Sequence, residues 1–73
     1  MNLKNAITHY HQLRATAQEA NAQFAYGKVL ICIENARTTT EALSYLHDEV
    51  SNATSTQRRE IYIDAIFAMH KEN

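Results

Sequence analysis

Hydrophobic residues recur every three or four positions through the first third of the chain. The pattern begins at Leu3, passes Tyr10 and Leu13, and ends at Phe24. Residues at this spacing share one face of an α-helix. The pattern therefore predicts a helix over about 3–25, in which several alanines would let a second helix approach closely.

The next segment fits more than one structure. Gly27 is compatible with the end of the first helix or with the interior of one helix that continues into the next segment. Residues 28–34 are apolar on all sides and rich in β-branched side chains, a composition found in buried helices and in strands. The spacing of Glu34 and Arg37 favours a helix, which we expect over about 28–37.

Two capping boxes mark the remaining helices. A Thr-x-x-Glu sequence begins at Thr38 and a Thr-x-x-Gln sequence begins at Thr54. In a capping box the first side chain accepts a hydrogen bond from the backbone three residues on, and the last side chain reaches back. Helices are therefore expected over about 39–51 and about 55–71.

Together these patterns predict an all-α fold, a small bundle of three to four helices in one domain over 1–73, with the first two helices separate or continuous. The alternative is an α/β fold with strands near 28–34 and 60–67. Two strands alone are hardly stable, so that fold would need a second protomer to complete its sheet.

The composition points to a small core. Only 15 of the 73 residues are Ile, Leu, Val or Phe, which is close to the level of about one-fifth below which chains tend to be disordered. The last helix nevertheless carries more large apolar residues than one packed face needs. We therefore expect a homodimer or a docked partner. The expected contact residues are Tyr10, Leu13, Ala17, Phe24, Tyr62, Ile66, Phe67 and Met69.

Charge and cysteine content narrow the cellular setting. The net charge is −1, which provides no overall field to hold nucleic acid or anionic lipid. The single cysteine, Cys32, cannot form an intramolecular disulfide, whereas small secreted domains usually have several. No signal-peptide pattern and no apolar stretch of about 18 residues is present. The expected location is the cytoplasm, without a membrane partner.

Catalytic patterns are missing from the sequence. None of the four histidines has a histidine, cysteine or carboxylate three or four positions away, as a metal site on one helix would need. A single glycine excludes a glycine-rich phosphate loop. Cys32 lies in the most apolar segment and is expected to be buried and inert. We therefore expect no enzymatic activity, no metal and no cofactor.

In kind, the chain resembles the small accessory proteins that phages, plasmids and bacterial operons use to bind and modulate a larger protein. The resemblance covers no motif, but it matches a short, glycine-poor helical chain without catalytic residues. The expected function is therefore non-enzymatic. The protein would bind and modulate a larger protein partner, as a homodimer.

The alternative function is a small DNA-binding transcriptional regulator. Residues 41–67 resemble a helix-turn-helix element, with a connection of suitable length that lacks the usual glycine. The residues expected to contact DNA are Thr56, Gln57, Arg58 and Arg59. Acidic residues on the preceding helix would oppose a phosphate backbone, which makes this the second choice.

Overall fold

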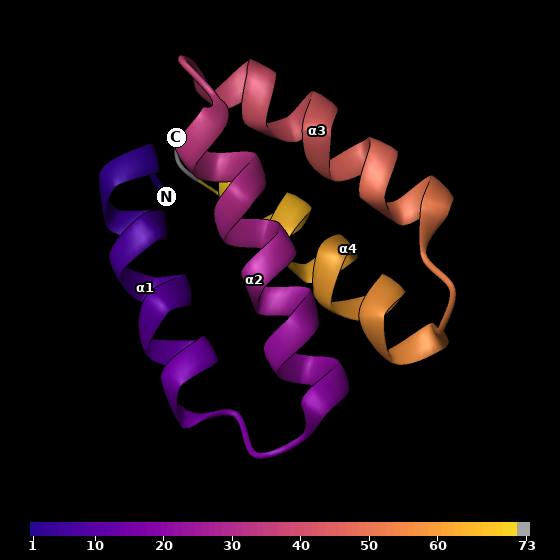
Figure 1. The fold of residues 1–73 in the computed structure, drawn as a ribbon. Coiled ribbons are helices and arrows are strands. Elements are labelled where there is room, and N and C mark those ends of the chain that lie inside the picture. Colours follow the sequence, from indigo (N-terminus) through magenta and orange to yellow (C-terminus); the bar gives the residue numbers. More distant parts are fainter. Residues whose placement is uncertain (72–73) are drawn as a thin grey trace.

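The computed structural model describes residues 1–71, within which the chain forms four helices and no strand (Figure 1). The helices are α1 (Leu3–Thr16), α2 (Ala20–Asn35), α3 (Thr39–Asn52) and α4 (Thr56–His70). The all-α prediction is confirmed and the α/β alternative is wrong, because both proposed strands are helical. Residues 72 and 73, which the single-domain prediction over 1–73 includes, lie outside the described residues.

The boundary between the first two helices differs from the prediction. The helix expected over 3–25 ends at Thr16, and α2 includes Gly27 in its interior. The backbone is extended at Ala17 and Glu19, with ψ of 134° and 138°. A continuous helix over 3–35 would be about 50 Å long, but the longest dimension of the protein is 30 Å. Folding back at this turn lets α1 bury its apolar face against α2.

Hydrogen bonds from distant side chains support this turn. The Ala17 carbonyl accepts from Gln23 Nε2 at 2.8 Å, and Gln57 Nε2 of α4 donates to Glu19 Oε1 at 2.8 Å. The turn contains neither Gly nor Pro, so no local signal in the sequence announces it. Tertiary contacts here override a high helix propensity.

The start of α3 agrees with its predicted capping box. Thr38 Oγ1 accepts from the Glu41 backbone N–H at 3.1 Å. The Glu41 carboxylate reaches back one residue further than expected and accepts from the Arg37 N–H at 2.9 Å. The helix expected over about 39–51 is therefore confirmed within one residue.

The start of α4 lies one residue later than its predicted cap. Ser55, rather than Thr54, is the N-cap, and its Oγ accepts from the Arg58 N–H at 3.2 Å. With Ser55 as the cap, Gln57 is two residues after it and not three, and its Nε2 donates to Glu19 Oε1.

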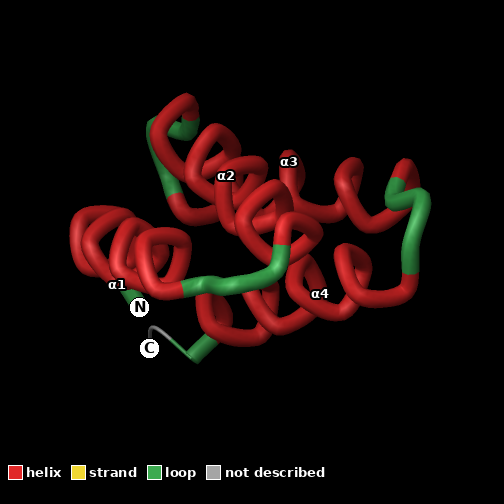
Figure 2. Tube along the Cα trace, turned by 60° about the horizontal axis from the view of Figure 1, so that its bottom comes forward, coloured by secondary structure: helices red, strands yellow, loops and turns green. Residues whose placement is uncertain are grey.

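The helix α2 is the centre of the fold, since it packs against each of the other three helices. Figure 2 shows α4 running below α2 and α3, so that these three helices enclose most of the core, while α1 packs on the outer side of α2. The largest fully buried side chains are Tyr62, Ile33, Leu46, Met69 and Val29. The radius of gyration, 11.0 Å, equals the value of about 11 Å expected for a compact domain of this length.

Gly27 is expected to be replaceable by Ala with a gain in stability. Its backbone is helical, and an added Cβ would lie 3.7 Å from Arg14 Nε, an ordinary contact distance. Ala in a helix interior is favoured over Gly by about 0.5–1 kcal/mol. Urea unfolding of the G27A variant should show this gain. A loss of stability would mean that this position needs glycine for a reason other than helix geometry.

Candidate interaction surface

The structure buries half of the eight predicted contact residues in its own core. Tyr10, Tyr62, Ile66 and Met69 are buried, with exposed fractions of 4, 2, 8 and 1%. Leu13 and Ala17 are half-buried, and Phe24 and Phe67 are exposed. The surplus of apolar residues in α4 is largely explained by its position, because α4 packs against both α2 and α3.

Three large apolar side chains are exposed within residues 1–71. The exposed fractions are 46% for Phe24, 53% for Ile31 and 61% for Phe67. Sequence reasoning missed Ile31 because it lies in a segment that is apolar on all sides. The signal that could have found it is its spacing from Phe24, seven residues or nearly two helical turns, which places both on one side of a helix.

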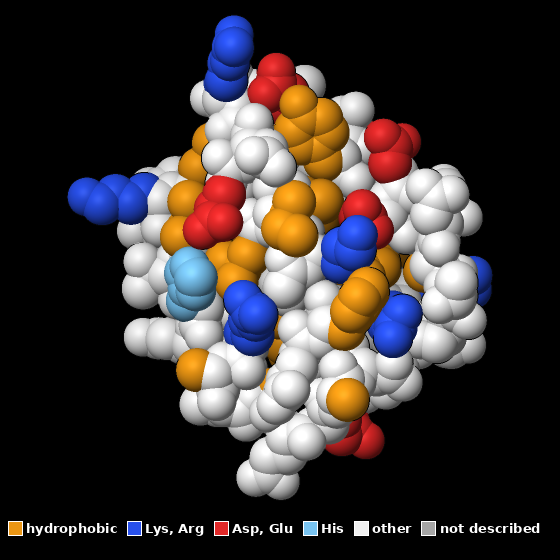
Figure 3. Space-filling view, in the orientation of Figure 1, with side chains coloured by type: hydrophobic (Ala, Val, Ile, Leu, Met, Phe, Trp, Pro, Cys, Tyr) orange, Lys and Arg blue, Asp and Glu red, His pale blue; other side chains and the backbone are white. Residues whose placement is uncertain are grey.

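Phe24, Gly27, Lys28, Ile31 and Glu34 lie along one side of α2, which we call the α2 face. Figure 3 looks onto this side of the molecule, and Figure 1 shows α2 at its front. Orange apolar side chains lie near the centre of the view, with red and blue side chains around them. The face therefore combines exposed apolar groups with charges of both signs.

Cations surround the N-terminal half of the α2 face. The Arg58 guanidinium carbon lies 4.0 Å from the centre of the Phe24 ring, and Lys28 Nζ lies 5.8 Å from it. Arg58 Nε also donates to Asn21 Oδ1 at 3.0 Å. An arginine is unfavourable near a helix N-terminus because of the helix dipole. The contacts with Phe24 and Asn21 offset that cost.

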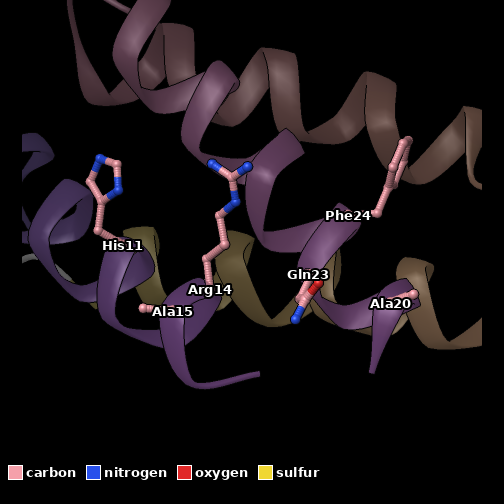
Figure 4. Close-up of a pocket in the computed structure, with 6 residues that line it drawn as sticks. All are labelled: His11, Arg14, Ala15, Ala20, Gln23 and Phe24. Carbon is pink, nitrogen blue, oxygen red and sulfur yellow. The ribbon is translucent and has the colours of Figure 1, made fainter. Parts of the chain in front are cut away.

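A third cation, Arg14, extends from α1 along α2. Figure 4 shows it in a hollow between the two helices, with His11 on one side and Gln23 and Phe24 on the other. Its guanidinium lies beside Gly27, where the missing side chain leaves room.

Carboxylates surround the C-terminal half of the α2 face. On the α1 side, Glu34 Oε2 lies 3.4 Å from His11 Nε2. On the α3 side, Asp48 and Glu49 line a second hollow together with Ile31. Charge along α2 is therefore divided, with cations around Phe24 and carboxylates around Ile31.

Cys32 is buried at the bottom of the hollow beside α3, with 5% of its surface exposed. Burial, with a smaller contribution from the Glu49 carboxylate, raises the pKa of the thiol to about 11. Because only the thiolate is a nucleophile, this environment suppresses reactivity.

The Cys32 thiol is expected to react slowly in the folded protein. A pKa raised from 9.0 to about 11 lowers the thiolate fraction at pH 8 by about 100-fold. Labelling with a chromogenic disulfide at pH 8 should therefore be at least that much slower in buffer than in denaturant. Equal rates in the two solutions would contradict the buried environment.

The four residues proposed for DNA contact are divided. Thr56 and Arg59 are exposed, but Arg59 Nη2 donates to the Ala53 carbonyl oxygen at 3.4 Å. Gln57 is bonded to Glu19, the N-cap of α2, and Arg58 is bonded to Asn21 of α2. Three of the four residues are therefore engaged in contacts within the protein. The geometry favours a structural role for Arg58 over readout of a nucleic acid.

Two further observations concern residues 1–71. Over this range no three His, Cys, Asp or Glu side chains are grouped closely enough to hold a metal ion. None of the helices formed by these residues has the length and apolar character needed to cross a membrane.

Comparison with known proteins found no matching protein-family model, no matching curated protein and no matching solved structure.

Proposed function

We propose that this chain is a non-enzymatic interaction protein that binds and modulates a larger protein partner. The observation that carries the proposal is the exposure of Phe24, Ile31 and Phe67 on a protein whose core is already closed. Fully burying a side chain of this size contributes about 1.5–3 kcal/mol. A partner that covers these side chains would gain much of that free energy.

The arrangement of these side chains supports the proposal further. Single exposed hydrophobic residues are common on protein surfaces, but contiguous apolar groups rimmed by polar residues are typical of contact sites. Phe24 and Ile31 share the α2 face. Phe67 lines a separate hollow with Met1 and Ala68, which we call the Phe67 patch.

The Phe67 patch is held together by a contact between the two ends of the described chain. The Met1 amino group donates to the Ala68 carbonyl oxygen at 3.1 Å. Asp64 and Lys71 line the same hollow, so the apolar patch has charged groups of both signs at its rim. An apolar centre with a polar rim is the usual anatomy of a protein-binding surface. We assign the larger partner to this patch.

Capture from a lysate of the cells that make the protein tests this proposal. Immobilised wild-type protein should retain a specific protein, and the F67D variant should lose it. Lys4→Ala, an exposed change on α1, is the matched control and should retain it. Failure of the wild type to capture anything beyond an uncoupled resin, or equal capture by F67D, would refute the proposal.

A DNA-binding assay with the same purified protein distinguishes this function from the alternative of a DNA-binding regulator. We expect no shift of duplex DNA at low ionic strength. Binding to duplex DNA that falls steeply with salt, and that weakens when Arg58 and Arg59 are replaced together, would favour the regulator instead.

A further inference from the structure

We propose that the α2 face is the surface through which two copies of this chain associate, with their α2 helices antiparallel about a two-fold axis near Gly27 and Lys28. This inference rests on the proposed function, because it assigns one of the two apolar surfaces to a second copy. The Phe67 patch then remains open to the larger partner.

The apolar residues of the α2 face fit such an axis. In a two-fold interface, if residue i of one copy contacts residue j of the other, then residue j of the first copy also contacts residue i of the second. An axis midway between positions 27 and 28 places Phe24 opposite Ile31 of the second copy, and does so twice. Gly27 lies next to the axis, with the Arg14 guanidinium of its own chain beside it.

Charges on the α3 and α4 side fit the same axis. Arg58 lies at the level of Asn21 and Phe24, to which it is bonded and stacked. Asp48 lies at the level of Ile31 and Asn35, with which it lines a hollow. Since the axis exchanges these two levels, Arg58 of each copy lies opposite Asp48 of the other.

The α1 side of the face carries no such match. The Arg14 guanidinium lies beside Gly27, at the level of the axis, and Glu34 Oε2 lies 3.4 Å from His11 Nε2 of its own chain. The charge match across the axis therefore rests on Arg58 and Asp48.

This division of charge distinguishes a second copy from other occupants. An acidic or a basic partner would be matched by a face of one sign. Here Arg58 lies beside Phe24 and Asp48 lies beside Ile31, so these two charges are complementary when the face is reversed. Lys28 lies near the axis, where its ammonium group lies over the Phe24 ring of its own chain.

Sedimentation equilibrium of the purified full chain tests the interface. The wild-type mass should rise from 8.3 kDa toward twice that value as the concentration rises to about 500 μM, a range that covers the micromolar affinities of small interfaces. The I31D variant should stay monomeric while keeping its helical circular dichroism spectrum. The F67D variant should still dimerise, because the Phe67 patch lies outside the interface.

A charge exchange tests the orientation. In the antiparallel dimer, the single variants R58E and D48K each place like charges opposite one another and should weaken association by at least about tenfold. An equimolar mixture of the two should restore it, because both contacts in the mixed dimer then join opposite charges.

A wild type that remains monomeric over the whole range would overturn this inference. So would an I31D variant that dimerises like the wild type, or a mixture of R58E and D48K that associates no better than its components. A monomeric wild type would leave the assignment of the Phe67 patch standing, since capture from a lysate decides that assignment separately.

Discussion

Ile66→Asp is expected to remove a large part of the protein's free energy of unfolding. Ile66 is 8% exposed and belongs to the core cluster. Placing a carboxylate there removes apolar burial and puts an unpaired charge among apolar groups, at a cost of about 4 kcal/mol or more. A chain of this length has a free energy of unfolding of roughly 4–11 kcal/mol. Circular dichroism at 222 nm, followed through a urea titration, measures the loss.

The neighbouring Phe67→Asp is the matched control, because the same charge is added one residue further along the same helix. Phe67 is 61% exposed, so this variant should fold with nearly the stability of the wild type. If both variants lose a similar amount of stability, the outward position of Phe67 is wrong. If neither does, α4 is rotated from the position described.

Ile33→Ala is the second change with a large expected effect. Ile33 is 1% exposed on α2 and is one of the largest fully buried side chains. Truncating a fully buried Ile to Ala leaves a cavity and costs about 2–5 kcal/mol. The midpoint of urea unfolding should fall accordingly, with an unchanged slope.

Ile31→Ala makes the same truncation two residues earlier and serves as the control. Ile31 is 53% exposed, so its loss should change stability by no more than about 0.5 kcal/mol, measured at concentrations where the protein is monomeric. A larger effect of Ile31→Ala than of Ile33→Ala would mean that α2 presents the opposite side to the core.

The second half of the fold could be predicted from sequence because its signals are local. Thr38 and Glu41 mark the start of α3 by hydrogen bonds between residues three or four positions apart. The turn at 17–19 could not be predicted in this way. The hydrogen bonds that support it come from Gln23 and from Gln57, and Gln57 lies 38 positions away from Glu19. Helix propensity and periodicity describe single segments and cannot anticipate such contacts.

The contact surface was harder to predict than the fold, for a related reason. Periodicity identifies an apolar side of a helix but not which neighbour covers it. Tyr62 and Met69 looked available for a partner, yet α2 and α3 enclose the side of α4 on which they lie. Ile31 lies in a segment whose composition suggested burial, yet 53% of its surface is exposed. Only the arrangement of the four helices in space separates these cases.

Arg58 illustrates how tertiary contacts change the interpretation of a motif. A basic first turn after a short connection is typical of a recognition helix. In the fold, the Arg58 side chain lies on Phe24 and binds Asn21. The same residue that suggested DNA binding therefore supports the packing of α4 on α2 and helps form a charged face.

A concentration series of ¹⁵N–¹H spectra tests, residue by residue, whether the α2 face is a contact surface. Amide signals of Phe24, Gly27, Ile31 and Glu34 should shift together as concentration rises, accompanied by those near Asp48 and Arg58, while signals near Phe67 stay in place. Spectra that do not change with concentration, or shifts confined to α4 around Phe67, would contradict that role.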